Sequence, residues 1–472
     1  MQIKTLELKD FKSWERSGQL AFAPITAFFG SNSSGKTSLL QSLLLLKQTT
    51  DSADRGSVFD LGSRTSLAEL GTFSDLLFKH DVERTLTISL DWLADEALEI
   101  RDTTERRSAF HTSSRELAID VEVSLGRTGP LVERVTYHLG DQEFMLGRKN
   151  SKGDYQLESP TFPLKRVQGR AWPLPKPNKF YGFPDQVRAY YQNASFLSDL
   201  ELAFEEMCGR IYYLGPLRND PQRQYTWSGN RPSGVGKRGE YAVDALIASA
   251  ADEQQRNHRG FTRKITSTGR RTRTPAISIQ RNVAEWLKEL GLIHSFSVKP
   301  IDDRGTLYQV LVRRSAASTE VLLTDVGFGI SQVLPVLVLL AYVPEGSVVL
   351  LEQPEIHLHP AVQIGLADIF IEVAKVRDVQ VVVESHSEHL LLRLQRRIAE
   401  EGLPNDRVPL VPQDCALYFC DSQGSRSVAR KLELDDYGNI SNWPTDFFGN
   451  SLEEAASMTI AAMERSAKSG HA

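Results

Sequence analysis

The sequence predicts an α/β fold, because three short apolar runs have the composition of buried parallel strands and each is followed by polar residues. The runs are Ile25–Phe29, Ser347–Leu351 and Val379–Val383, the last interrupted only by Gln380. Continuous apolar, partly β-branched runs are typical of strands that are covered on both faces. Because the carboxyl ends of parallel strands meet at one edge, we expect one sheet with a site at that edge.

The residues after the first run form a complete phosphate-binding loop of the form G-x-x-x-x-G-K-T, and a leucine-rich helical run follows it. The glycines let the backbone fold around phosphate oxygens, and the helix start adds positive potential. We expect Lys36 to face solvent in the empty loop and to reach the β- and γ-phosphates of ATP, and the Thr37 hydroxyl to bind Mg²⁺. The loop comprises Gly30, Ser31, Asn32, Ser33, Ser34, Gly35, Lys36, Thr37 and Ser38.

The other two runs end in carboxylates. The second is followed by Glu352, Gln353 and Glu355, and the third by the sequence Glu384-Ser385-His386-Ser387. A carboxylate at the end of a buried strand beside a phosphate-binding loop holds Mg²⁺, directly or through water. We therefore expect Glu352 to share the metal with Thr37.

A second glycine-containing segment precedes the apolar helical run that ends at Val343. Glycines before a helix start predict an anion-binding nest, and Pro335 must then lie in the first turn or kink the helix. A single nucleotide site needs only one such helix start, so the second is expected to close over the nucleotide of another subunit. The candidate residues are Gly327, Gly329, Ser331 and Gln332.

The order of these motifs resembles that of ABC-type, SMC/RecF-like ATPases of the AAA family. The opening IKTLELKDFKSW, the EQPEIHLHP box and the VESHSEHLL box carry the resemblance. A G-F-G-x-S-Q-x-L-P signature, the G-P-L-R segment at 215–218 and the tail at 437–444 extend it to the ATPase halves of OLD-type nucleases and to ATPase subunits of bacterial anti-phage defence systems. The resemblance implies an ABC-type P-loop ATPase head with a β-rich subdomain and a helical/loop insertion. No long heptad region is present, so we expect no long coiled coil.

The resemblance also implies a role for each candidate residue. The phosphate-binding loop is the Walker A motif, and the segment from Gly327 to Gln332 is the signature that caps the opposite nucleotide. Glu352 takes the Walker B aspartate position, and His386 takes the position of the switch histidine that contacts the γ-phosphate.

One departure from the family pattern bears on turnover. Gln353 stands where the catalytic glutamate usually stands. An amide can orient a water molecule but is a very poor base. We therefore expect slow hydrolysis of ATP, unless Glu355 or another carboxylate substitutes. The catalytic candidates are Glu352, Gln353, Glu355 and His386.

These anchors divide the chain into four segments. Residues 1–85 are expected to form the N-terminal ATPase lobe, and 86–295 a β-rich and helical insertion for dimer or partner contacts. Residues 296–430 are expected to form the C-terminal ATPase lobe, and 431–472 a tail. Strands are predicted at Arg84–Leu90, Leu117–Leu125 and Val132–His138, an amphipathic helix at Gln280–Leu290, and two or three strands within Phe296–Leu323. Residues 226–275 are expected to be the least globular part.

Bulk composition excludes several classes of protein. A net charge of −5 argues against a uniformly basic nucleic-acid binder. Three cysteines make no disulfide framework, which fits a reducing cytosol. The N-terminus is not a signal peptide, and the longest apolar stretch, Val333–Val343, is too short to span a bilayer. We expect a cytoplasmic protein without membrane contact.

Two further features have alternative interpretations. The basic run Arg256–Arg273 could bind nucleic-acid phosphates or form a solvated loop, and Phe261 is its only aromatic residue. The histidines at 357, 359, 386 and 389 could form a metal site, but the resemblance accounts for them without metal.

The expected function is that of an ATP-binding, slowly hydrolysing ATPase that forms a homodimer or a higher even-numbered oligomer around ATP and Mg²⁺. About 85 residues follow His386, too few for a fused nuclease domain, so a separate effector, a nuclease or toxin, is expected as its partner in anti-phage defence. The alternatives are a RecF-like DNA-repair ATPase and an ATP-bound structural scaffold with negligible turnover.

Overall fold

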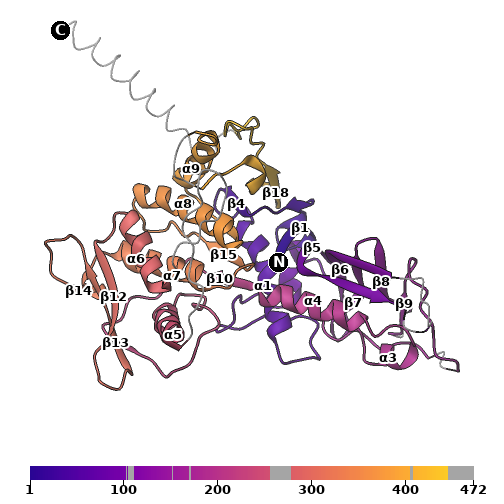
Figure 1. Cartoon of the computed structure of the whole chain (residues 1–472). Coiled ribbons are helices and arrows are strands. Elements are labelled where there is room, and N and C mark those ends of the chain that lie inside the picture. Colours follow the sequence, from indigo (N-terminus) through magenta and orange to yellow (C-terminus); the bar gives the residue numbers. More distant parts are fainter. Residues whose placement is uncertain are drawn as a thin grey trace, which may run out of the picture.

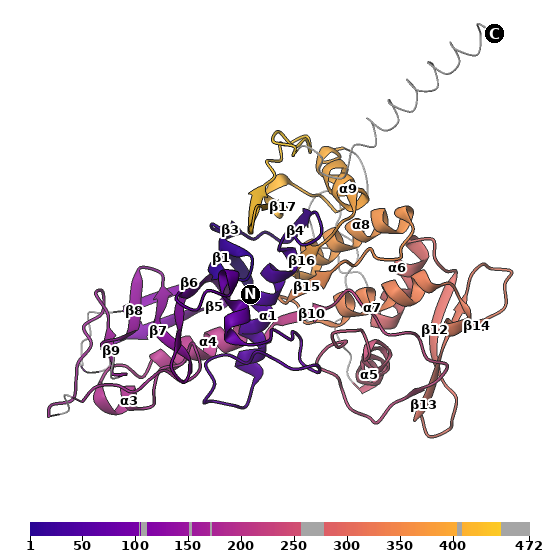
Figure 2. The ribbon, with the colours of Figure 1, turned by 180° about the vertical axis from the view of Figure 1, so that it is seen from behind.

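The computed structural model describes residues 1–102, 104, 111–150, 153–169, 172–255, 278–403 and 408–444. In these ranges a six-stranded, mostly parallel sheet lies centrally, with a long antiparallel sheet on one side and a small sheet with three helices on the other (Figure 1). The view from behind shows the same order of parts (Figure 2). This arrangement confirms the predicted α/β fold.

The central sheet contains all three predicted parallel strands. They are β4 (Ile25–Gly30), β15 (Val348–Glu352) and β16 (Gln380–Glu384), and β16 lies between the other two. Its other members are β10 (Ile211–Leu214), β17 (Cys415–Gln423) and the antiparallel edge strand β18 (Arg426–Lys431).

The central sheet is buried on both faces, which explains its continuous apolar runs. Along β15, Val348 and Leu350 belong to one hydrophobic core, together with α1 (Lys36–Asp51) and the antiparallel sheet. The alternate residues Val349 and Leu351 belong to a second core. That core is built with α7 (Phe328–Tyr342), α8 (Pro360–Arg377) and α9 (Glu388–Ala399).

The antiparallel sheet draws its strands from both sides of residue 85. The strands predicted at 84–90, 117–125 and 132–138 are confirmed as parts of β5 (Leu86–Arg101), β6 (His111–Gly126) and β7 (Gly129–Leu139), although β5 begins two residues later than predicted. The remaining strands are β1 (Gln2–Phe11), β2 (Trp14–Arg16), β3 (Leu20–Ala21), β8 (Gln142–Arg148) and β9 (Tyr155–Glu158). The short helices α2 (Phe73–Leu76) and α3 (Gln186–Tyr190) and the longer α4 (Leu197–Gly209) accompany this part of the chain, and α4 packs on α1 and β5.

The third sheet and three helices form the other side of the molecule. The predicted helix at 280–290 is confirmed as α6 (Ile279–Glu289), and the strands expected within 296–323 are confirmed as β12 (Ser295–Pro300), β13 (Leu307–Arg313) and β14 (Val321–Leu322). The expectation that 226–275 is the least globular part is wrong for residues 242–255. These form α5 (Ala242–Gln255), which buries Val243, Leu246 and Ile247 against α7, whereas residues 227–241, after β11 (Tyr225–Thr226), form no helix or strand.

The basic run Arg256–Arg273 lies outside the described residues. The longest helix within them, α8, has 18 residues, so the described ranges contain no long coiled coil. None of the described helices is long and apolar enough to cross a bilayer.

Candidate nucleotide-binding site

The phosphate-binding loop connects β4 to α1 at the carboxyl edge of the central sheet, and it requires both of its glycines. Gly30 has φ 137° and Gly35 has φ 88°, conformations that L-residues rarely adopt. A Cβ added to Gly30 would lie 1.9 Å from the Cys420 carbonyl oxygen, and one added to Gly35 would lie 2.3 Å from Ser427 Oγ. The β17–β18 hairpin therefore packs directly against the loop and holds its shape.

The ammonium of Lys36 is turned into the loop, so the expectation that it faces solvent is wrong. The residue is 3% exposed, and Nζ donates to the carbonyls of Gly30 at 3.1 Å and Ser31 at 2.6 Å and to Ser34 Oγ at 3.3 Å. Burial lowers the pKa of Lys36, and the nearby Glu384 carboxylate partly opposes this effect. The Lys36 ammonium points inward because a buried charge needs hydrogen-bond partners, and the curled loop places its own carbonyls within reach.

Two carboxylates lie side by side where β15 and β16 end. Glu352 and Glu384 are directly paired in the parallel register. Glu384 Oε1 accepts a hydrogen bond from Thr37 Oγ1 at 3.0 Å, whereas Glu352 Oε1 accepts one from the Tyr213 hydroxyl at 3.0 Å. The prediction placed Thr37 with Glu352, and Glu384 was not among the predicted site residues. The sequence pattern nevertheless indicated Glu384, because it follows the third apolar run directly, as Glu352 follows the second.

The electrostatics of this pair suit a divalent cation. Burial raises the pKa of Glu352 to about 7, and repulsion from Glu384 adds to the rise. Burial also raises the pKa of Glu384, whose Oε2 has no hydrogen-bond partner among the described residues. A cation would favour both charged forms, and hard oxygen donors of this kind fit Mg²⁺. Thr37, Glu352 and Glu384 are the residues that would hold it, with the phosphates of ATP.

The end of β15 is held in a strained conformation by a buried arginine. Gln353 has φ 44°, in the left-handed region, and its N–H donates to the Glu384 carbonyl at 2.8 Å. Arg218 is 6% exposed and donates to the carbonyls of Glu352 at 3.2 Å and Gln353 at 3.3 Å. Sequence analysis singled out Arg218 only as part of the G-P-L-R segment, and its contact with the strand end was not foreseen.

Glu355 and His386 connect the same strand end to the phosphate-binding loop. Glu355 Oε1 accepts from the His386 N–H at 2.6 Å, and burial raises the pKa of this carboxyl. The His386 side chain lies near the Gly30 backbone, and its pKa is lowered by burial and by the charge of Lys36. Both effects favour the neutral imidazole. All four catalytic candidates thus lie at the edge where the loop begins.

The signature segment lies at the start of α7, in a different environment. Gly327 precedes the helix with φ −60°, and neither Gly327 nor Gly329 has a positive φ, so the predicted nest is not formed. The segment instead offers a plain helix N-terminus. A Cβ added to Gly327 would meet no atom within 4 Å, and the neighbouring Phe328 is 51% exposed and packs edge-on against His357.

The other two signature residues point into the protein. The Ser331 hydroxyl donates to the Phe328 carbonyl in its own helix. Gln332 is buried, and its Nε2 has no hydrogen-bond partner among the described residues. Pro335 lies in the interior of α7 and not in its first turn.

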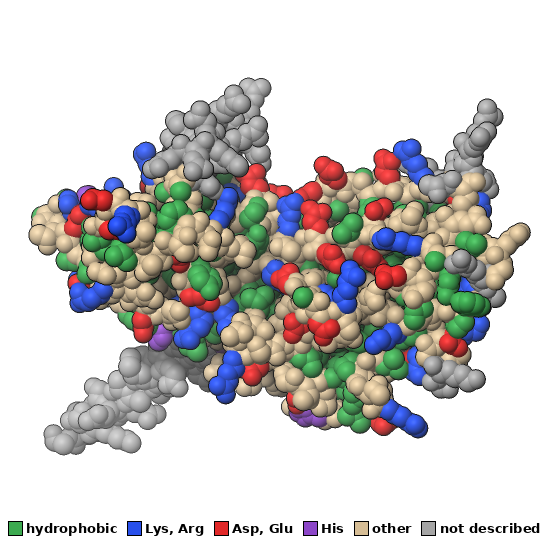
Figure 3. Space-filling view, turned by 90° about the horizontal axis from the view of Figure 1, so that it is seen from below, with side chains coloured by type: hydrophobic (Ala, Val, Ile, Leu, Met, Phe, Trp, Pro, Cys, Tyr) green, Lys and Arg blue, Asp and Glu red, His purple; other side chains and the backbone are tan. Residues whose placement is uncertain are grey.

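The histidines that suggested a metal site serve other contacts. His359 caps α8 by accepting from the Ala361 N–H at 3.3 Å, and His357 packs on Phe328. Within the described ranges, no group of three or more His, Cys, Asp or Glu residues could hold a metal ion. The face seen in Figure 3 carries interspersed acidic and basic side chains and no continuous basic surface.

Two protein-family models match parts of this chain, and one of them includes the phosphate-binding loop. A family model described as "AAA ATPase domain" matches residues 1–125 and 243–391. A second, described as "Protein of unknown function (DUF3696)", matches residues 410–458. No curated protein matches the chain.

Several solved structures are similar over most of the chain. The SMC head domain from Thermotoga maritima is 12% identical, with 92% of this chain and 100% of that chain covered and a TM-score of 0.40. An SmcHead bound to the C-winged helix domain of ScpA is 14% identical, with 92% and 99% covered and a TM-score of 0.45. An Smc head domain with an extended coiled coil, bound to the C-terminal domain of ScpA derived from Pyrococcus furiosus, is 12% identical, with 92% and 96% covered and a TM-score of 0.44.

The AAA ATPase domain model covers more than half of the 472 residues, including the phosphate-binding loop and both carboxylate-ended strands. The chain therefore belongs to the AAA ATPase domain family and is an ATP-binding P-loop ATPase.

Proposed function

We propose that the protein is an ABC-type ATPase that holds Mg²⁺–ATP between two subunits. In this proposal the phosphate-binding loop of one subunit binds the nucleotide, and the signature at the start of α7 of the other subunit caps it. The nucleotide-bound dimer then regulates a separate effector, a nuclease or toxin, in anti-phage defence.

One observation about helix starts carries the proposal. The helices α6, α8 and α9 begin with side-chain caps supplied by Ser278, His359 and Ser387. In contrast, α1 and α7 each begin at a glycine without a side-chain cap. A helix start has backbone N–H groups that need an acceptor, and an anion is the natural one.

The short helix α3 and the helix α4 also lack a side-chain cap, but they do not begin at a glycine. The two helix starts at a glycine do not serve the same place in one chain. The start of α1 lies with Lys36, Glu384 and His386 at the carboxyl edge of the sheet. The start of α7 contacts His357 and Leu358, on the segment that leads away from that edge. An open helix N-terminus beside an exposed Phe328 suits contact with a nucleotide held by a second copy.

The identity of Gln353 supports slow turnover. Its amide cannot accept the proton of the attacking water, and loss of a general base forfeits roughly 10²–10⁴-fold in rate. Glu355 is the nearest substitute by sequence, but its carboxylate already accepts from the His386 backbone. A long-lived ATP-bound dimer suits a regulator that leaves the ATP-bound state only when a trigger acts. The link to defence effectors rests on the resemblance of the signature and of the G-P-L-R segment.

The proposal is tested by light scattering followed by affinity purification from the native host. We expect Mg²⁺–ATP to double the mass of the wild-type protein but not that of Lys36→Ala. Tagged wild type with ATP should retain a nuclease or toxin that tagged Lys36→Ala does not. Retention of DNA in a salt-sensitive, stoichiometric complex would instead favour a RecF-like repair ATPase. Nucleotide-stabilised assembly with no partner and no turnover would favour a scaffold.

A further inference from the structure

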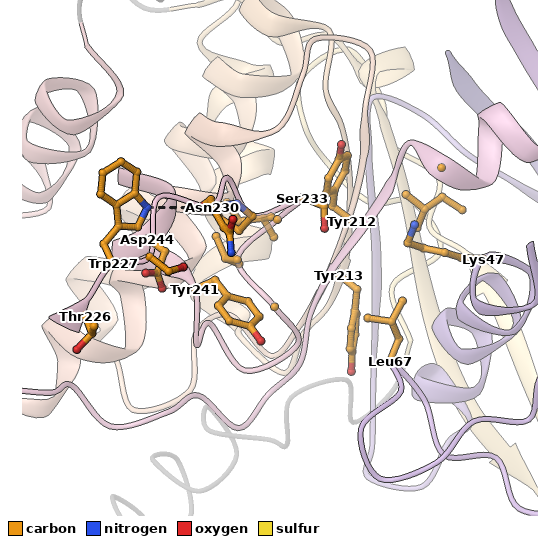
Figure 4. A pocket seen from close by; sticks show the side chains of 18 residues that line it. Lys47, Leu67, Tyr212, Tyr213, Thr226, Trp227, Asn230, Ser233, Tyr241 and Asp244 are labelled. Carbon is orange, nitrogen blue, oxygen red and sulfur yellow. Dashed lines mark hydrogen bonds between the residues drawn. The ribbon is translucent and has the colours of Figure 1, made fainter. Parts of the chain in front are cut away.

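A cavity of about 530 Å³ lies beside β10, the edge strand of the central sheet. One wall comes from β10 and α1, and the opposite wall comes from α5 and the glycine-rich segment 228–239 that precedes it (Figure 4). The first wall presents Tyr212, Tyr213 and Lys47, and the second presents Trp227, Tyr241 and Asp244. Cavities of this size hold drug-sized molecules.

The glycine-rich wall is fixed in place, so the cavity is already formed. Lys237 Nζ donates to the carbonyls of Arg64 at 2.7 Å and Ser66 at 2.6 Å, and the Lys237 carbonyl accepts from the Gly215 N–H at 2.8 Å. Gly239 has φ 75°, and a Cβ there would lie 2.5 Å from Pro335 Cβ. The backbone of this segment therefore packs directly on α7 and is tied to the loop before α2.

The lining selects for a ring without negative charge. The Tyr241 ring is 51% exposed and lies opposite Tyr213 across the cavity (Figure 4). The Lys47 ammonium is paired with Asp51 at 3.1 Å, which weakens its attraction for an anion in the cavity. Asp244 makes no ion pair with any described residue. Aromatic walls favour a planar ring, and the carboxylate favours a donor or a positive charge on that ring.

We propose that this cavity binds a planar aromatic molecule, neutral or cationic and of nucleoside to drug size, and that Tyr213 couples its binding to the nucleotide site. The ring of Tyr213 lines the cavity, and its hydroxyl donates to Glu352 Oε1 at 3.0 Å. An occupant that shifts the ring changes this hydrogen bond and hence the carboxylate that would hold Mg²⁺. The coupling rests on the proposed function, whereas the binding site does not.

Binding is tested with proflavine, a planar aromatic cation, by fluorescence titration of the full chain without nucleotide. We expect one saturable site per chain, displaced by the neutral ring compound adenosine. Asp244→Asn and Tyr241→Ala should each weaken binding about tenfold. The control is Tyr437→Ala, which removes an aromatic ring that is 77% exposed and lies in another part of the fold, and it should bind like the wild type. Absence of saturable binding, or equal affinity of the Asp244→Asn and wild-type proteins, would overturn the site.

Coupling is tested by measuring ATP turnover with and without saturating proflavine. We expect a change of about fivefold in the wild-type protein. Tyr213→Phe keeps the ring but loses the hydroxyl, so it should still bind proflavine while turnover no longer responds. A response that persists in Tyr213→Phe would refute the coupling. If the protein does not turn over ATP at all, the fluorescence titration still decides the binding site, so the two failures are distinguishable.

Discussion

Replacing Arg218 by lysine should cost the protein little stability but most of its ATP turnover. The guanidinium holds two adjacent carbonyls at the end of β15 and thereby keeps Gln353 in its left-handed conformation. A lysine ends in a compact ammonium without the planar fork that reaches both carbonyls from one side chain, so we expect Arg218→Lys to lose one of these two hydrogen bonds. One buried carbonyl left unpaired costs about 1–3 kcal/mol. For a chain of 472 residues, this corresponds to a fall in Tm of about 1–3 °C.

The effect on turnover is larger because the freed strand end carries Glu352 and leads into Gln353. A misplacement of about 1 Å at a reacting centre costs roughly 10²-fold in rate, so Arg218→Lys should turn over ATP about a hundredfold more slowly. Arg377 provides a matched control. It is a half-buried arginine that also donates to two backbone carbonyls, those of Leu340 and Val343, but it lies at the end of α8. Arg377→Lys should lose similar stability and keep its turnover.

The result that refutes this reasoning is an Arg218→Lys protein with wild-type turnover and a lowered Tm. That outcome would mean that the arginine supports folding only. A loss of turnover in Arg377→Lys that equals the loss in Arg218→Lys would also refute it, because the effect would then follow from stability and not from the position of the strand end.

Three further predictions concern the same edge of the sheet. Lys36→Met should abolish the ATP-induced thermal shift while the protein stays folded, and an unchanged shift would remove Lys36 from the site. Gln353→Glu should accelerate hydrolysis by up to roughly 10²–10⁴-fold, and Glu355→Gln should slow the wild type only if Glu355 substitutes as the base. In EDTA, Glu352→Gln should raise Tm at pH 8 but not at pH 4. The reason is that the pKa of Glu352, raised from 4.5 to about 7, makes the folded state lose stability as the pH rises through that range. Equal shifts of Tm at both pH values would contradict this.

Sequence reasoning located the strands and the loop because their signals are local. The runs that form β4, β15 and β16 are continuous and apolar, and each is followed by polar residues within a few positions. Parallel pairing then brings their ends together whatever lies between them in the chain. The position of Glu384 beside Thr37 follows from the same logic, although only Glu352 was selected.

What sequence reasoning missed depends on contacts between distant segments. Tyr213 and Arg218 reach Glu352 only because β10 pairs with β15, and nothing near residue 213 indicates that pairing. The burial of Lys36 depends on the three-dimensional curl of the loop. The helix α5 was missed because its glycine-rich and basic flanks dominated the composition of that region.

The central claim is that the signature of one subunit completes the nucleotide site of the other. It is tested most directly by mixing two variants, Lys36→Ala and Gly327→Glu. The first lacks the lysine of the phosphate-binding loop, and the second places a negative charge where an anion would approach. The new side chain meets no atom near its Cβ, so the fold should be kept. Each variant alone should be inactive, because both of its composite sites are defective.

In a mixed dimer, the intact loop of the Gly327→Glu subunit faces the intact signature of the Lys36→Ala subunit. We expect an equal mixture to recover roughly a quarter of wild-type turnover, since half of the dimers then carry one intact site of two. Copurification of differently tagged subunits shows that mixed dimers have formed. Mixed dimers without any recovery of turnover, or full turnover by Gly327→Glu alone, would contradict the account.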